Sequence, residues 1–169
     1  ARNEDGSPNL DLNNSYYNPI YIAENNLYLM AQTRLLNSSA VEYDITESLK
    51  FTSQIGLDFL YSEQLNYDNR NYGDGRAVNG YSFGYTDRNF NWNWKNILDY
   101  NLPLSGNHVF DFKVVYEVQK NKHNALSVGG YDIAADGLYY PSSVATVSYY
   151  TGYVNNWALV SMLGTVTYK

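Results

Sequence analysis

The chain has no cysteine among its 169 residues, so it contains neither a disulfide framework nor a thiolate metal site. It also lacks any run approaching the roughly 20 consecutive apolar residues that a membrane-spanning helix needs, and its mean hydropathy is -0.46. These absences exclude a small disulfide scaffold and a helical membrane protein. They leave transmembrane β-barrels open, because barrel strands alternate apolar and polar residues and look hydrophilic on average.

Basic clusters and catalytic spacings are missing as well. The 11 Lys and Arg residues are scattered against 17 Asp and Glu, which gives a net charge of -6 and no footprint for a nucleic-acid partner. The only two histidines, His108 and His123, are far apart in the sequence, which argues against a shared metal. The acids show no catalytic spacing either, so we expect no catalytic residue, no bound metal and no enzyme.

Tyrosine is what the chain has in abundance: 19 Tyr and 3 Trp stand beside only 6 Phe. Side chains that are half apolar and half polar suit membrane interfaces and sugar-binding surfaces. Both settings remain open on composition alone.

Alternation of apolar and polar residues predicts five strands and no helix. The strands are expected at 28–44, 49–65, 88–101, 108–120 and 157–168. The segment 1–26, which Pro8 and Pro19 interrupt, is predicted to be irregular. Each predicted strand reaches the length of about ten residues that a tilted membrane crossing needs, whereas strands average roughly 5–6 residues in soluble proteins.

The predicted connections alternate in length. Those at 45–48 and 102–107 are short, whereas 1–26, 66–87 and 121–156 are long. Outer-membrane barrels have short periplasmic turns and long outer loops. The sequence therefore predicts an all-β fold, an antiparallel up-and-down transmembrane β-barrel segment in the cell outer membrane that crosses it several times.

The two faces of these strands have different expected neighbours. We expect the apolar face to contact membrane lipid through Phe51, Ile55, Leu57, Phe59, Trp92, Trp94, Phe110, Phe112, Val114, Val160 and Met162. The opposite face is expected to line a lumen and to pair charges across strands through Lys50, Asp58, Lys95, Asp99, Asp111, Lys113 and Glu117. Aromatic belts are expected at the outer interface (Phe59, Tyr61, Trp92, Tyr116, Trp157) and the inner one (Tyr43, Tyr100, Tyr168).

Five strands are an odd number with two unpaired edges, and bacterial single-chain barrels have even numbers of strands. We therefore expect the chain to be part of a larger barrel wall. Period-2 alternation also describes a secreted soluble β-sandwich, such as a carbohydrate-binding module, whose inner face is a protein core. A small structural or adhesive barrel is the third possibility.

Five runs of the sequence together form a recognisable pattern: 18–26 (NPIYIAENN), 43–51 (YDITESLKF), 93–96 (NWKN), 100–102 (YNL) and 163–168 (LGTVTY). In these runs the chain resembles the SusC/RagA family of TonB-dependent outer-membrane transporters from Bacteroidota. The likeness extends from about residue 18 to residue 169.

This resemblance implies that residues 1–169 are part of the β-barrel domain of a 22-stranded nutrient transporter, without its plug domain. It also implies import of glycans or peptides, a SusD-like surface lipoprotein as a lid, and a TonB complex that acts through the plug. The rest of the barrel and the plug would be further partners of the chain.

Two candidate sites fall in the predicted outer loops. The tyrosines of 121–156 could stack on a sugar ring or contact a lid protein; they are Tyr139, Tyr140, Tyr149, Tyr150 and Tyr153. In 66–87, oxygens of Asp68, Asn69, Asn71 and Asp74 could bind calcium, although their spacing does not match an EF-hand. A polar, solvated loop is the alternative there, and no other cofactor is expected.

Overall fold

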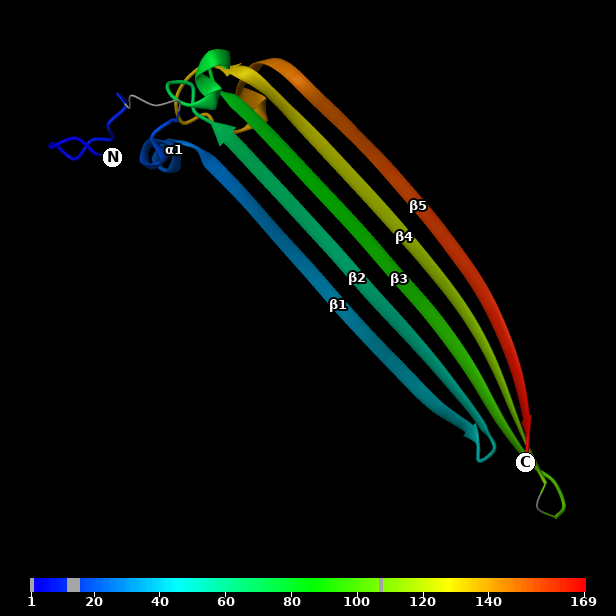
Figure 1. The fold of residues 1–169 in the computed structure, drawn as a ribbon. Coiled ribbons are helices and arrows are strands. Elements are labelled where there is room, and N and C mark those ends of the chain that lie inside the picture. The colour runs from blue at the N-terminus through cyan, green and yellow to red at the C-terminus, as the bar shows by residue number, and fades with distance from the viewer. Residues whose placement is uncertain (1, 12–15, 107) are drawn as a thin grey trace. The chain divides into compact units, whose positions relative to one another are not determined.

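The computed structural model describes residues 2–11, 16–106 and 108–169, which form one antiparallel sheet of five strands. The strands pair in the order of the chain, β1 to β5, as Figure 1 shows. Their bounds are β1 Leu27–Thr46, β2 Leu49–Asp68, β3 Tyr81–Pro103, β4 Val109–Ile133 and β5 Val144–Tyr168. The predicted all-β, up-and-down arrangement is confirmed. The described residues do not form a β-sandwich, because they contain no second sheet packed on the first.

The strands are longer than the sequence pattern predicted, and two loop predictions were therefore partly wrong. Residues 81–87 belong to β3, and most of 121–156 belongs to β4 and β5. The two connections that were predicted to lie outside the membrane, named here the outer connections, are therefore only 69–80 and 134–143. Each contains a short 3-10 helix, Asp74–Val78 and Pro141–Ser143. The turn predicted at 102–107 begins two residues later than predicted, because β3 extends through Pro103. The last residue of the predicted turn, Asn107, lies outside the described residues.

The prediction of no helix in 1–26 was also wrong. Helix α1 covers Pro19–Asn25, and the side chain of Asn18 accepts a hydrogen bond from the backbone N–H of Ile20 at 3.0 Å. Proline at the first position of a helix loses no hydrogen bond, and asparagine is a favoured N-cap. Pro19 therefore starts this helix instead of breaking it. Of the same predicted segment, residues 1 and 12–15 lie outside the described part.

Contacts divide the chain into two units, and all five strands contribute to each. The loop unit comprises Ala1–Gln32, Tyr61–Asp87 and Ala125–Tyr153, and it contains α1 and both outer connections. The turn unit comprises Thr33–Leu60, Arg88–Asn124 and Val154–Lys169, and it contains both short turns. The fully buried large apolar side chains among the described residues, Tyr67 and Ile133, both belong to the loop unit.

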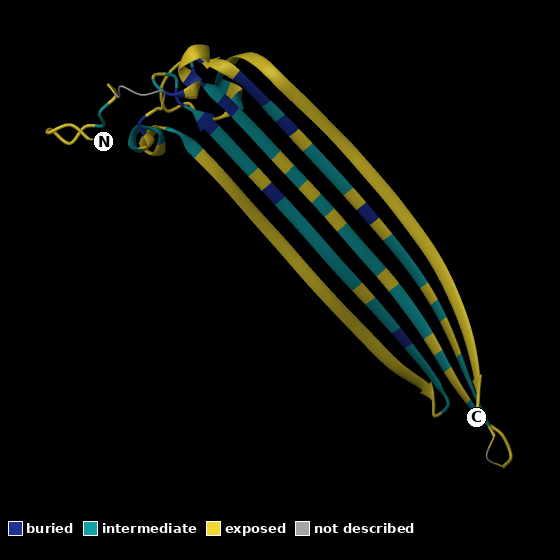
Figure 2. Ribbon diagram, in the orientation of Figure 1, coloured by how far each residue is buried: buried dark blue, intermediate teal, exposed yellow. Residues whose placement is uncertain are grey.

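The edge strands are exposed along their length. In β1 and β5 every residue after the first is exposed, whereas most residues of β2, β3 and β4 are half-buried or buried (Figure 2). Large apolar side chains are among the exposed ones, including Met30 at 75% and Met162 at 77%. An exposed apolar strand with one unpaired side calls for a partner.

Among the residues that the structure describes, no helix is long and apolar enough to cross a membrane.

Candidate functional site

One face of the turn unit carries ion pairs between neighbouring strands. Arg34 of β1 and Asp58 of β2 make two hydrogen bonds, at 3.0 and 2.9 Å. Further pairs follow along the sheet: Lys50–Glu42 at 2.8 Å, Lys113–Asp99 at 3.1 Å, Lys95–Glu117 at 3.9 Å and Lys169–Asp111 at 2.9 Å. The charged pairing expected across strands is therefore present, and it includes all seven residues predicted for the lumen face.

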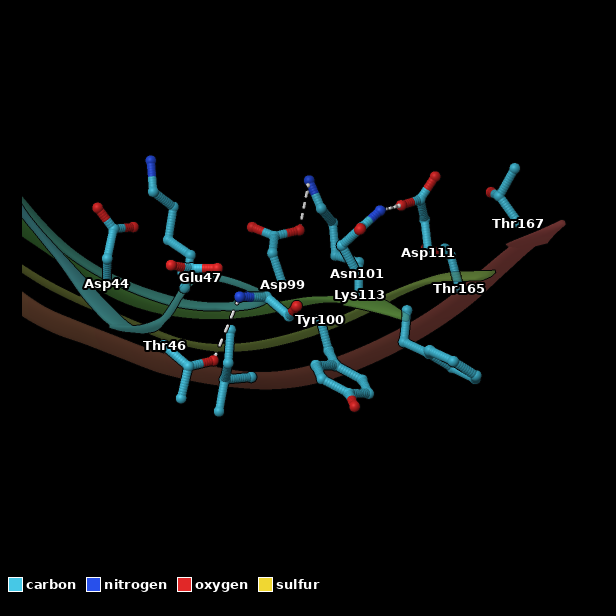
Figure 3. A pocket seen from close by; sticks show the side chains of 14 residues that line it. Asp44, Thr46, Glu47, Asp99, Tyr100, Asn101, Asp111, Lys113, Thr165 and Thr167 are labelled. Carbon is cyan, nitrogen blue, oxygen red and sulfur yellow. Dashed lines mark hydrogen bonds and ion pairs between the residues drawn. The ribbon is translucent and has the colours of Figure 1, made fainter. Parts of the chain in front are cut away.

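The turn end of this face surrounds a hollow of about 1130 Å³. Its polar lining includes Asp44, Glu47, Lys50, Asp99, Asn101, Asp111, Lys113 and Thr165. In Figure 3, Asp44, Asp99 and Lys113 point to one side of the sheet, and the ring of Tyr100 points to the other. Alternation along the strand thus separates charges from aromatic rings at this end.

The opposite face of the turn unit carries a row of rings near the turns. Tyr100 stacks on Phe112 with centroids 6.2 Å apart, and Phe110 lies 6.1 Å from Phe112 and 4.9 Å from Tyr168. Two of these, Tyr100 and Tyr168, were predicted for the inner aromatic belt. Farther along β2 and β3, Phe59 contacts Phe90 edge-on at 6.3 Å.

The polar atom of Trp94 has a partner on this apolar face. Its indole Nε1–H donates to Ser53 Oγ at 2.9 Å, while 44% of the residue remains exposed. A donor placed in hydrocarbon needs such a partner, because lipid offers none. The eleven residues predicted to face lipid lie on β2, β3, β4 and β5 in the turn unit. That they touch lipid stays a prediction.

In the loop unit, the two outer connections are joined by hydrogen bonds. Arg70 donates from Nη1 to the carbonyls of Ile133 at 3.1 Å and Ala134 at 2.6 Å, and Asn71 donates to both Asp136 oxygens at 3.1 Å. Asn79 donates to Asp132 at 2.6 Å. Polar residues that composition assigned to a solvated loop therefore form an ordered junction.

Helix α1 and the ring of Tyr139 pack on the same unit. Tyr72 contacts Tyr17 and Tyr21 edge-on at 5.3 and 5.0 Å. Tyr139 meets the buried ring of Tyr67 at 5.0 Å, and its carbonyl accepts from Ser82 Oγ at 2.6 Å. Burial, followed by the negative charge of Asp136, raises the pKa of Tyr67, which lies beyond the segment 49–65 predicted to cross the membrane.

Two of the four residues considered for calcium, Asp68 and Asn69, have side-chain oxygens that accept hydrogen bonds from the protein. Asp68 Oδ1 accepts from Asn26 at 2.9 Å and from Tyr28, and Asn69 Oδ1 accepts from the backbone N–H groups of Asn71 and Tyr72. No group of three or more His, Cys, Asp or Glu that could hold a metal ion occurs within the described ranges. Asp68 thus links the end of β2 to Asn26 and β1, and Asn69 caps the turn that follows it. That this loop binds calcium stays a prediction.

The five tyrosines predicted for an outer loop divide between two elements. Tyr139 and Tyr140 lie in the connection 134–143, but Tyr149, Tyr150 and Tyr153 lie on β5, so their assignment to a loop was wrong. The glycines of 121–156 suggested a loop, yet Gly129, Gly130 and Gly152 occupy strand positions where neighbours approach closely.

Sequence reasoning missed an aromatic group on β3, the residues Tyr81, Phe83 and Tyr85. Their spacing of two was visible in the sequence but lay inside the predicted loop 66–87. Tyr85 donates its hydroxyl to Asp87 at 2.8 Å, and this bond raises the pKa of Tyr85 to about 12. Tyr85 lies outside the segment 88–101 predicted to cross the membrane.

Comparison with known proteins gives a likeness in fold. No protein-family model matches the chain, and no curated protein matches it. One chain of the RagAB peptide importer in the "open-open" state aligns with a TM-score of 0.78 and 15% identity, over 90% of this chain and 17% of that chain. A chain of the RagAB peptide transporter aligns with a TM-score of 0.78 and 14% identity, over 97% and 19%.

The "closed-closed" RagAB importer gives a TM-score of 0.77 at 15% identity, over 90% of this chain and 17% of that one. The chain thus spans less than a fifth of the length of these structures. At such identities, what is shared is the fold: five long antiparallel strands in a continuous meander.

Proposed function

We propose that this chain is a wall segment of an outer-membrane β-barrel transporter that imports nutrients, glycans or peptides, in the manner of SusC/RagA proteins. The observation that carries the proposal is the alignment of 90% of the chain, at a TM-score of 0.78, with part of a peptide importer. The likeness supplies the fold, and the two faces of the strands supply the physical argument.

The faces suit a wall between lipid and water. Ion pairs join neighbouring strands on one side of the turn unit, where a lumen or plug can solvate or pair them. On the other side lie contacting rings and an indole whose N–H is bonded within the sheet. Only one face of such a sheet is apolar enough, with its polar groups hydrogen-bonded, to lie against hydrocarbon.

The edges of the sheet support a larger assembly. Strands β1 and β5 have one neighbour each in the sheet order and expose large apolar side chains. Unpaired backbone groups cannot stay in a bilayer, so we infer that further strands of the same barrel pair with both edges. A plug inside the barrel, the TonB complex that engages it and a SusD-like lipoprotein over the outer side complete the proposed machine.

A pair of matched substitutions tests this function. Val114→Arg puts a charge on the proposed lipid face of β4, and Val115→Arg puts the same charge on the neighbouring residue of the opposite face, between Lys113 and Glu117. In the full-length protein, arginine near the middle of a lipid face costs about 2–4 kcal/mol. Val114→Arg should reduce the heat-modifiable, folded barrel in outer-membrane fractions, and Val115→Arg should leave it near the parent amount.

Leu57→Arg is expected to behave like Val114→Arg, because Leu57 belongs to the same proposed face on β2. Equal assembly of the 114 and 115 variants, or a protein that remains soluble and monodisperse without detergent, would contradict the proposal.

A further inference from the structure

Aromatic side chains of two non-adjacent strands meet on one face of the loop unit. Tyr81, Phe83 and Tyr85 occupy alternate positions of β3 and therefore share a face of that strand. The ring of Phe83 lies 6.1 Å from the ring of Tyr149 on β5, with their planes tilted by 42°. Since β4 runs between β3 and β5, these two rings contact each other across an intervening strand.

Glycine at position 129 of β4 makes that contact possible. A Cβ at Gly129 would stand 2.9 Å from Tyr81 Oη and 3.1 Å from Phe83 Cδ2. The aromatic rings thus occupy the space that a side chain on β4 would fill.

We name the group of Tyr81, Phe83, Tyr85 and Tyr149 the aromatic platform. Tyr149 is 46% exposed, and the three rings of β3 are half-buried, so the platform offers ring surface to a ligand while its base is held by packing. Tyrosine and phenylalanine provide large contact areas with few rotatable bonds, which lowers the entropic cost of binding.

The platform's surroundings are polar but carry few charges. Ser127 lies two residues from Gly129 on the same face of β4, and Asp87 accepts the hydroxyl of Tyr85. No Lys or Arg occurs in the parts of β3, β4 and β5 that belong to the loop unit. These strand parts offer no side-chain cation to the carboxylate of a peptide, whereas Asp87 and the tyrosine hydroxyls can bond the hydroxyl groups of a ligand. Arg70 and Arg76 of the same unit lie in the connection 69–80, where Arg70 is bonded to the carbonyls of Ile133 and Ala134.

We propose that the aromatic platform is a binding subsite for an uncharged saccharide, whose ring stacks on Phe83 and Tyr149 while Asp87 and nearby hydroxyls bond its edge. Flat apolar faces bordered by a few polar groups fix the orientation of such a ligand. The inference rests on the proposed import function, and within it names the ligand class and the residues that hold the ligand.

The test uses the full-length protein in detergent micelles, an array of uncharged oligosaccharides and a set of hexapeptides, with affinities measured by calorimetry. Phe83→Leu keeps an apolar side chain but removes the ring, and Gly129→Val separates the rings. Gly164→Ala is the matched control, because a Cβ there meets nothing within 4 Å. We expect the Kd of the best saccharide to rise about tenfold with Phe83→Leu and with Gly129→Val, and to stay unchanged with the control.

Two results would overturn the inference. One is that no saccharide binds, or that saccharide binding is indifferent to Phe83→Leu. The other is that hexapeptides bind and lose affinity in this variant while saccharides do not, which assigns the platform to peptides. If the parent protein is nevertheless found as a folded barrel in the outer-membrane fraction, only the saccharide subsite is refuted and the proposed import function is not. If the parent protein is absent from that fraction, the proposed import function itself is contradicted.

Discussion

Truncation of Ile133 to alanine should loosen the loop unit without unfolding the turn unit. Ile133 ends β4 and is 0% exposed, and its side chain lies close to Gly80, while Arg70 bonds its carbonyl. Removing three buried carbons costs about 2.4 kcal/mol by transfer alone, and the cavity raises the total to about 3–4 kcal/mol. Because the residue belongs to the junction of the outer connections, the cost falls on local opening.

Hydrogen exchange read by mass spectrometry measures this opening in the full-length protein. A loss of 3 kcal/mol corresponds to roughly a hundredfold faster exchange in peptides covering 69–80 and 134–143. Peptides covering 88–101 should exchange as in the parent. Val147→Ala, at a position 53% exposed in the same unit, is the control and should change little. Equal exchange in the Ile133 and Val147 variants would show that this junction is not an ordered, packed body.

Three further predictions concern single contacts. Ser53→Ala leaves the indole N–H of Trp94 without its partner, so the free energy of unfolding, measured by thermal unfolding in micelles, should fall by about 1–2 kcal/mol. Ser53→Thr keeps a hydroxyl group and should lose much less stability. Asn18→Ala removes a fully buried N-cap, so we expect about 1 kcal/mol less stability and faster proteolysis of α1, with unchanged proteolysis refuting the cap. The bond from Tyr85 to Asp87 should stabilise fully below pH 10 and be lost as the pH rises through about 12, because the pKa is raised in the folded state; the difference in tyrosinate absorbance between parent and Tyr85→Phe locates it.

Period-2 alternation was enough to predict the fold class and the charged face. Aromatic and charged residues alternate cleanly in 88–101 and 108–120. There, ion pairs between neighbouring strands, such as Lys113 with Asp99, could be expected from the sequence. The pattern does not reveal backbone pairing with neighbours. Residues 121–133 alternate poorly and contain Gly129 and Gly130, yet they extend β4 because strands on both sides bond to it.

The helix and the aromatic platform of the loop unit were harder to predict for a related reason. Asn18 and Pro19 are an N-cap and a first helical residue, which together can start a helix. Because the helix is short, Pro19 was interpreted as a residue that interrupts regular structure. The aromatic platform needs residues from β3 and β5 to meet across a glycine of β4, and no local window contains that information. Contacts that span such distances in sequence become visible only once the register is known.

We propose that one face of these strands touches lipid and that the other faces a lumen. Spin labels placed singly at 114 and 115 in the full-length protein, reconstituted in lipid bilayers, test it directly through collision with oxygen, which concentrates in lipid, and with a water-soluble nickel chelate. We predict high oxygen and low nickel accessibility at 114, and the reverse at 115. Nickel accessibility that is equally high at both positions, or equally low at both, would contradict the account.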